Sequence, residues 1–197
     1  MFLLETGIII VTTFLLIVVL LVSMKYIEGR LVKLYEGPTN NIKYSSQLYY
    51  PQIDIQRAIN LVIAGGEEQF DERYSQMEKD VENDLALIDD AYTKLHDNLL
   101  TEEDKASLEE INDKLKNEVT THRTKVLEYL QNGDFDAART YVTDNYKPAV
   151  DEVKVQIEEL EESIDNTAQD YRNSASTMAI IMIIIGVVTV SYTHLTL

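Results

Sequence analysis

Residues 150–190 read VDEVKVQIEELEESIDNTAQDYRNSASTMAIIMIIIGVVTV, and this stretch carries the two patterns that decide the fold. From Asn173 to the end of the chain only His194 can carry a charge, and Met178–Val190 forms the apolar centre. A helix needs roughly 20 apolar residues to cross about 30 Å of hydrocarbon, so the second half predicts a membrane-spanning helix at residues 176–192. In the first half, apolar side chains recur in steps of three and four, which line one face of a bundle helix: Val150, Val153, Ile157, Leu160, Ile164, Ala168 and Tyr171.

A second uncharged apolar stretch lies at the other end of the chain, between Thr6 and Met24. It predicts a first transmembrane helix within residues 1–25, because lipid-exposed backbone must satisfy its own hydrogen bonds. A cleaved signal peptide would carry positive residues before the apolar run and small residues at a cleavage site after it. The sequence shows neither feature and therefore favours an uncleaved anchor.

Acidic residues dominate between the two apolar stretches and account for nearly all of the formal net charge of −17. A domain of this charge would meet the phosphates of nucleic acid with like charge, which argues against nucleic-acid binding. Most of the acidic side chains are expected on solvated helix faces. The chain has no cysteine, which excludes a disulfide framework and zinc thiolates.

Sparse helix breaks divide the region between the spans into four expected helices. Gly65-Gly66 and Asn132-Gly133 suit helix ends because these residues accept positive φ. Thr101 and Asp134 suit helix starts because their side chains can cap free backbone N–H groups. The helices are expected at about residues 26–64, 67–99, 101–131 and 134–175, within a domain that covers 26–175.

The apolar spacing within these helices stays close to 3.5 residues, which predicts one seam along each helix. The first seam is the least regular, and Pro38 and Pro51 are expected to bend or loosen its helix because each removes a backbone donor. Short connections make neighbouring helices antiparallel, and the expected fold class is an all-α, up-down-up-down four-helix bundle flanked by two transmembrane helices. The first seam comprises Ile27, Leu31, Leu34, Ile42, Leu48, Ile55, Ile59 and Val62.

No enzyme motif occurs: the sequence lacks a phosphate loop, a dinucleotide fingerprint, a nucleophile elbow and a zinc-protease helix. We therefore expect a protein that is not an enzyme and that needs neither a cofactor nor a metal. His96 and His122 lie on different expected helices, and His122 falls on a seam. Both are interpreted as core or interface residues.

Four arginines are candidate ligand-binding residues. Counted by helical rise from the nearest breaks, all four fall within about 15 Å of the tip of the bundle that lies far from the membrane. Planar guanidinium groups hold carboxylates bidentately, so a group of them in an acidic domain suits a small anionic solute. The competing interpretation of any single arginine is a surface salt bridge. The four are Arg57, Arg73, Arg123 and Arg139.

Three segments carry a resemblance to a known family: Leu34–Pro38, the double-glycine hairpin, and Leu130–Ala138, which reads LQNGDFDAA. They resemble the sensor region of bacterial methyl-accepting chemotaxis receptors. The resemblance covers about residues 7–190. It implies a homodimer in the bacterial plasma membrane, with the bundle outside the cell and both termini in the cytoplasm. It also implies a small-molecule ligand or a solute-binding protein as partner.

The amino-terminal end departs from this family. Met1–Gly7 contains no lysine or arginine, whereas such receptors usually begin with them. Lys25, Arg30 and Lys33 follow the first span, and by local charge count alone they would place the bundle in the cytoplasm. The orientation outside the cell therefore rests on the resemblance.

The carboxy-terminal end departs as well, because such receptors continue past the second span into a HAMP linker and a long cytoplasmic hairpin. The chain ends seven residues after Val190, and the tail Ser191–Leu197 resembles a translated sequencing adapter, which indicates truncation. Contact with a cytoplasmic kinase complex is expected only through the missing region. Two alternatives stay open: the sensor region of a membrane histidine kinase, and a ligand-free structural coiled-coil protein tethered to the membrane.

Overall fold

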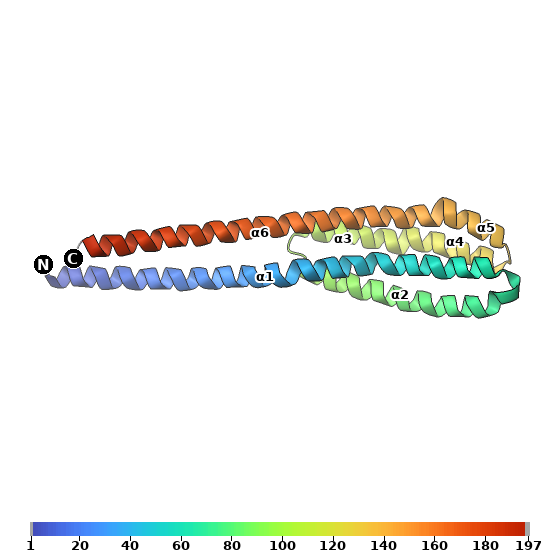
Figure 1. Cartoon of the computed structure of the whole chain (residues 1–197), viewed down its shortest axis with the longest axis horizontal. Coiled ribbons are helices and arrows are strands. Elements are labelled where there is room, and N and C mark those ends of the chain that lie inside the picture. Colours follow the sequence, from blue (N-terminus) through green and yellow to red (C-terminus); the bar gives the residue numbers. More distant parts are fainter. Residues whose placement is uncertain (1, 196–197) are drawn as a thin grey trace. The chain divides into compact units, whose positions relative to one another are not determined.

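The structure is a computed structural model that describes the backbone of residues 2–195. Side chains are described except at residues 2–6, 8–10, 12, 15–16, 30–39 and 189–195. The described backbone is helical apart from short turns and contains no strand (Figure 1), so the predicted all-α class is confirmed. The elements are α1 (Phe2–Gly65), the 3₁₀ helix η1 (Glu67–Gln69), α2 (Phe70–Asn98), α3 (Glu102–Lys114), the π-helical η2 (Leu115–Val119), α4 (Thr120–Gln131), α5 (Phe135–Tyr141), the π-helical η3 (Val142–Tyr146) and α6 (Lys147–Leu195).

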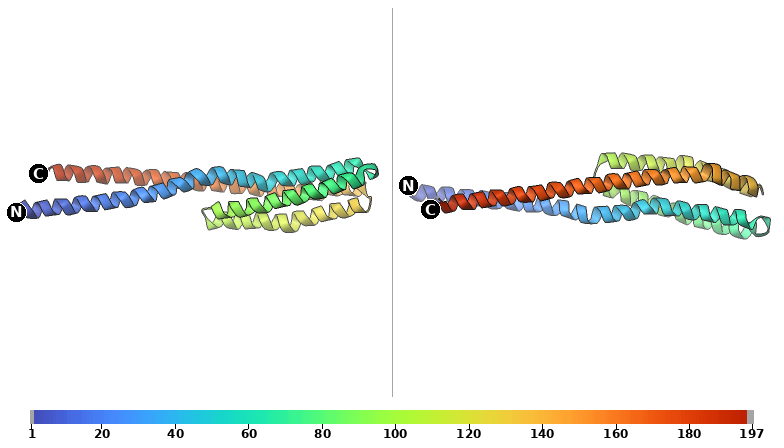
Figure 2. Two further views of the ribbon diagram at one scale, coloured as in Figure 1. Left: turned by 90° about the horizontal axis from the view of Figure 1, so that it is seen from below. Right: turned by 45° about the horizontal axis from the view of Figure 1, so that its top comes forward.

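The chain forms two compact units, which we describe separately. The terminal unit comprises Met1–Pro38 and Asn166–Leu197, and the bundle unit comprises Thr39–Asp165. Within the bundle unit, four helical stretches pack together: the end of α1, α2, the run from α3 to α4, and the run from α5 into α6 (Figure 2).

The core of the bundle unit is a continuous set of buried apolar side chains. Every described residue of the seam predicted for the last helix is buried except Tyr171. Burial of each large aliphatic side chain contributes roughly 1.5–3 kcal/mol, so these seams hold the helices together. The largest fully buried apolar side chains are Leu48, Ile55, Ile59, Val62, Met77, Leu95, Leu108, Ile111, Leu130, Tyr146 and Leu160.

The helix ends follow the local chemistry of the sequence. Thr101 caps α3 by accepting a bond from the Asp104 backbone N–H at 3.0 Å, and Asp134 caps α5 by accepting one from Ala137 at 3.0 Å. Both predicted caps are therefore confirmed. Gly66 and Gly133 have φ values of 58° and 74°, a conformation that costs other residues roughly 1–2 kcal/mol.

One position of the seam predicted for the first helix is wrong, because Ile42 is exposed. α1 is helical through both Pro38 and Pro51, so the predicted bending or loosening at the prolines stays a prediction. The observed seam includes polar as well as apolar residues. The spacing between its successive members alternates between four and three residues: Asn41, Ser45, Leu48, Gln52, Ile55, Ile59 and Val62.

Some of the buried polar side chains in these seams have partners within the bundle unit. The Ser45 hydroxyl donates to the Glu161 carboxylate, which joins α1 to α6. The Asp104 carboxylate accepts bonds from the Thr101 hydroxyl and from Ser163, each at 2.6 Å. Hydrogen bonding offsets the cost of burying these groups, so Ser45 and Asp104 fix the register of neighbouring helices.

The two π-helical segments occur where buried seam residues follow one another at three successive spacings of four residues. One series runs from Ile111 to Arg123, and the other runs from Ala138 to Val150. An α-helix has 3.6 residues per turn, so such a series would carry the seam off its face unless the helix is locally unwound. A π turn provides that unwinding, and the Thr120 hydroxyl donates to the Leu115 carbonyl five residues back at 2.9 Å.

In the terminal unit, most of the large apolar side chains that the structure describes are exposed, whereas Ala168 and Ala175 are buried. Among the residues that the structure describes, one helical run is long and apolar enough to be a candidate membrane span, Phe135–Val188, and none of its apolar window is buried. Much of the predicted first span, within residues 1–25, lies outside the described side chains, as does the tail Ser191–Leu197. The predictions for those residues therefore stay predictions.

Candidate functional site

Arg123 is the most unusual polar residue of the bundle unit. It lies in α4, one turn after η2, and only 7% of the residue is exposed. Its Nη2 donates to the Thr120 hydroxyl at 3.2 Å, while its Nη1 is buried and makes no hydrogen bond within the described part of the chain. Burial lowers the pKa of the guanidinium, although an arginine stays protonated at any physiological pH. Arg123 is therefore a buried cation.

A cavity of about 280 Å³ adjoins Arg123, and we call it the Arg123 cavity. Its walls come from α1, α2, α3, η2 and α4. Gln52 and Asn112 line it, and a side-chain oxygen of each is buried and lacks a hydrogen bond in the described structure. Since buried polar atoms are usually paired, these groups make the cavity a candidate site for a polar ligand. The lining residues are Gln52, Leu85, Ile88, Asp89, Asn112, Leu115, Lys116, Thr120 and Arg123.

The charges around the cavity leave Arg123 without a counter-ion. Asp89 and Lys116 also line it, but they pair with each other at 3.3 Å. No carboxylate of the described residues lies within ion-pair distance of Arg123. The cavity therefore carries one uncompensated positive charge within a strongly acidic chain.

Tyr146 is a further unpaired polar residue, and it lies close enough to Arg123 for an electrostatic interaction. It ends η3, is fully buried, and its hydroxyl makes no hydrogen bond among the described residues. Burial raises the pKa of Tyr146 to about 12, while the charge of Arg123 acts to lower it. Tyr146 therefore stays neutral and cannot act as the counter-ion of Arg123.

The other three predicted arginines have different surroundings. Arg57 pairs with Asp54 at 3.3 Å and is largely exposed. Arg73 donates to the Leu61 carbonyl at 2.5 Å across the Gly65-Gly66 turn, and Arg139 pairs with Asp136 at 3.0 Å. Arg57 lines a separate pocket of about 300 Å³ near Leu61. Arg57 and Arg123 therefore line two different pockets.

Comparison with known protein families decides what kind of domain carries this cavity. The family model described as a four helix bundle sensory module for signal transduction matches residues 2–179. The chain belongs to this family. No curated protein and no solved structure gives a significant match. The domain is therefore a sensory module of the kind found in chemoreceptors, and no catalytic family is identified.

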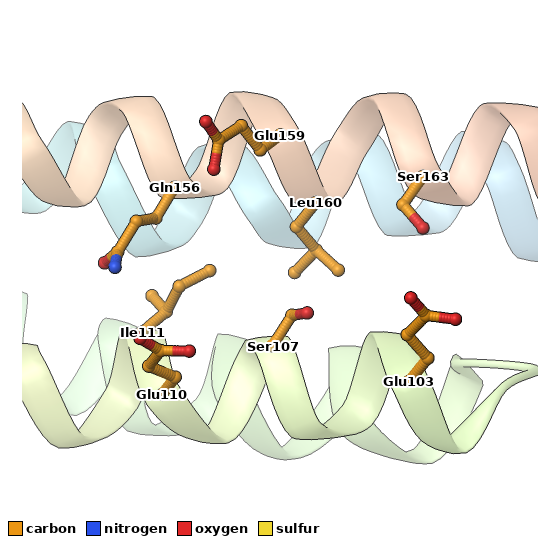
Figure 3. A pocket seen from close by; sticks show the side chains of 8 residues that line it. All are labelled: Glu103, Ser107, Glu110, Ile111, Gln156, Glu159, Leu160 and Ser163. Atoms are coloured by element: carbon orange, nitrogen blue, oxygen red, sulfur yellow. The ribbon is translucent and has the colours of Figure 1, made fainter.

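The sensory module has a second pocket of about 280 Å³, between α3 and α6 (Figure 3). Glu103, Glu110 and Glu159 line it, so it is acidic and would repel an anion. Its buried polar group without a hydrogen bond is the side-chain oxygen of Gln156. The described residues include no group of three potential ligands that could hold a metal ion. This pocket therefore offers less specific chemistry than the Arg123 cavity.

The two histidines on the helices of the sensory module contact neighbouring side chains. His122 is half-buried, and its Nδ1 lies 3.0 Å from the Tyr141 hydroxyl. His96 lies 3.9 Å from the carboxylates of Asp97 and Glu109. These contacts join α4 to α5 and α2 to α3, which fits the interpretation of both histidines as packing residues.

Proposed function

We propose that this sensory module is the sensor and transmembrane portion of a chemotaxis receptor, which binds a small extracellular solute and passes a helix displacement across the membrane. The observation that carries the proposal is α6, a single helix that includes the last seam of the bundle unit and the exposed apolar stretch that follows it. A helix shared by a sensor and a span can pass a movement from one to the other. A solute drives such a movement only if it binds one of two states more tightly.

The location belongs to the proposal. We place the bundle unit outside the cell and both ends of the chain in the cytoplasm, as in a two-pass protein of the bacterial plasma membrane. The exposed apolar side chains of the terminal unit support a lipid environment, because a surface of this kind is costly in water. The positive residues after the first span argue for the opposite orientation, so topology needs its own measurement.

The partners follow from the same proposal. The receptor would act as a homodimer, with a small molecule or a solute-binding protein as its stimulus and a cytoplasmic kinase complex as its target. That target would be reached through a region carboxy-terminal to this sequence. Exposed apolar residues on the bundle unit, among them Leu61 and Val155, provide surface for a second chain.

A membrane histidine kinase is the alternative output, because the family description names a sensory module and leaves the signalling partner open. The coding sequence after Val190 separates the two. A HAMP segment followed by a long heptad hairpin supports the chemotaxis receptor. A phosphoacceptor histidine with an ATP-binding module supports the kinase.

The functional test is a chimera in which residues 1–190 replace the sensor and spans of a characterised chemoreceptor. Kinase activity is measured in membrane vesicles against a panel of organic acids, amino acids, sugars and peptides. We expect at least one solute to change the activity. An inserted, folded chimera whose activity stays constant across the panel would contradict the proposal and favour a ligand-free coiled coil.

A further inference from the structure

We infer that the Arg123 cavity binds a small organic acid with one carboxylate, and that the acid sits between the helices of a single bundle. This inference rests on the proposed function, because it names the site and the chemical class of the solute. It differs from the predicted site at the tip, where the candidate arginines lie near the helix breaks. Here one arginine holds the ligand, inside the helical core.

The first argument is the unpaired charge. A buried ion without a partner is costly, and the cost is offset when an opposite charge binds next to it with good geometry. Arg123 uses Nη2 to donate to Thr120, whereas its Nη1 makes no hydrogen bond in the described structure. A guanidinium presents two parallel N–H donors that match the two oxygens of a carboxylate. The free donors of Arg123 therefore suit this group.

The second argument sets the charge of the ligand. Asp89 and Lys116 compensate each other on the cavity wall, so Arg123 alone supplies a net positive charge. Asp89 would repel a second carboxylate on the ligand. The other cation on the wall, Lys116, is already paired with Asp89. The cavity should therefore prefer a monocarboxylate to a dicarboxylate of similar size.

The third argument concerns the rest of the ligand. Leu85, Ile88 and Leu115 form an apolar part of the wall, which suits a short hydrocarbon group. The side-chain oxygens of Gln52 and Asn112 can accept a hydrogen bond from a ligand hydroxyl or amino group. A volume of about 280 Å³ lies near the lower end of the roughly 300–1,000 Å³ of small-molecule sites. A short hydroxy acid meets all three requirements.

The position of the cavity gives such a ligand access to several helices at once. Its walls include Gln52 from α1, Leu85 from α2 and the π-helical η2. Isolated π turns inside α-helices occur frequently at functional sites. A ligand bound here would contact α1 as well as η2, the π-helical segment between α3 and α4.

The binding test uses the full chain in lipid nanodiscs and titration calorimetry. The probes are lactate, propionate without the hydroxyl, succinate with a second carboxylate, lactamide without the charge, and chloride. We expect lactate to bind and each other probe to bind more weakly. Arg123→Met should weaken lactate binding by roughly 10- to 100-fold, the usual loss for a hydrogen-bonded charged contact. Lys125→Met, which alters an exposed cation already paired with Glu128, is the control and should bind normally.

A second measurement separates a binding role from a structural one. If Arg123 is held for a ligand, Arg123→Met should raise the melting temperature of the ligand-free chain by roughly 2–8 °C, because it removes an uncompensated buried charge. If Arg123 holds the fold, the same change should lower it. Should Arg123→Met fail to fold, Arg123→Lys keeps the charge but loses the planar fork, and we expect lactate binding to weaken by about tenfold.

Four results would overturn the inference. They are lactate binding that is unchanged in Arg123→Met, a melting temperature that falls in that variant, chloride binding as tight as lactate binding, and no binding of any carboxylate probe. In each case the chimera reports separately on the proposed function. A chimera that still responds to another solute leaves the receptor assignment standing while removing this site.

Discussion

At the scale of single residues, the bundle buries polar atoms that lack hydrogen-bond partners in the described structure. Tyr146 is the clearest case for stability, because its hydroxyl lies in the core and burial raises its pKa to about 12. An unfolded tyrosine ionises near pH 10. The folded state therefore favours the protonated form, and its contribution to stability is complete below about pH 10 and is lost as pH rises towards 12.

Tyr146→Phe should remove this alkaline loss. Between pH 10 and 12 the wild-type chain should lose about 2 kcal/mol of unfolding free energy relative to the variant. At pH 7 the variant should be as stable or slightly more stable, because it lacks the unpaired hydroxyl. Urea unfolding from pH 8 to 12 measures both effects. Tyr50→Phe, which alters an exposed tyrosine, is the control, and equal pH dependence in all three proteins would refute the account.

The sequence predicted only part of the candidate site. The sequence identified Arg123 by its charge and its distance from a helix break. It did not predict that Arg123 lies on the buried side of its helix. A regular heptad places His122 on the seam, but the extra residue in η2 shifts the buried face to Arg123. Gln52 and Asn112 were missed because a search for apolar spacing passes over polar side chains. The strict alternation of fours and threes along α1 was the available signal for Gln52.

At the scale of elements, helix limits were predictable because caps and glycine breaks act locally. Thr101 and Asp134 begin helices, and Gly66 and Gly133 end them, as their chemistry requires. The π segments were not predicted, because they depend on packing of the whole seam against neighbouring helices. Pro51 was expected to bend or loosen the first helix, and α1 continues as helix through it. Packing of the surrounding seam outweighs the loss of one backbone donor.

Deleting one residue from η2 should convert the π turn to regular α-helix. When exposed Asn117 is deleted, the spacings between successive buried residues from Asp104 to Leu130 alternate regularly between four and three residues. The melting temperature should then change by no more than a few degrees. Deleting exposed Lys79 from α2 is the control, because it turns part of a seam without a π segment away from the core and should lower the melting temperature by about 10 °C or more. Calorimetry compares the two deletions, and equal losses would contradict the assignment of η2.

At the scale of the whole molecule, orientation decides whether the sensor meets extracellular solutes. The chain has no native cysteine, so a single introduced one is a clean reporter. Ser75→Cys lies on an exposed face of α2. In intact cells it should react with a membrane-impermeant maleimide, whereas labelling confined to lysed cells would place the bundle unit inside.

The most direct test of the central claim, a solute-driven displacement of α6 against α1, is a distance measurement within the terminal unit. Spin labels at Glu28→Cys and Arg172→Cys, both exposed, report that distance in nanodiscs by pulsed electron paramagnetic resonance. Labelled chains are diluted with unlabelled ones, so that the signal comes from one protomer. Saturating lactate should shift the distance by about 1–2 Å, the scale of helix movements in signalling proteins. An unchanged distance distribution, with lactate binding verified on the same sample, would contradict the account.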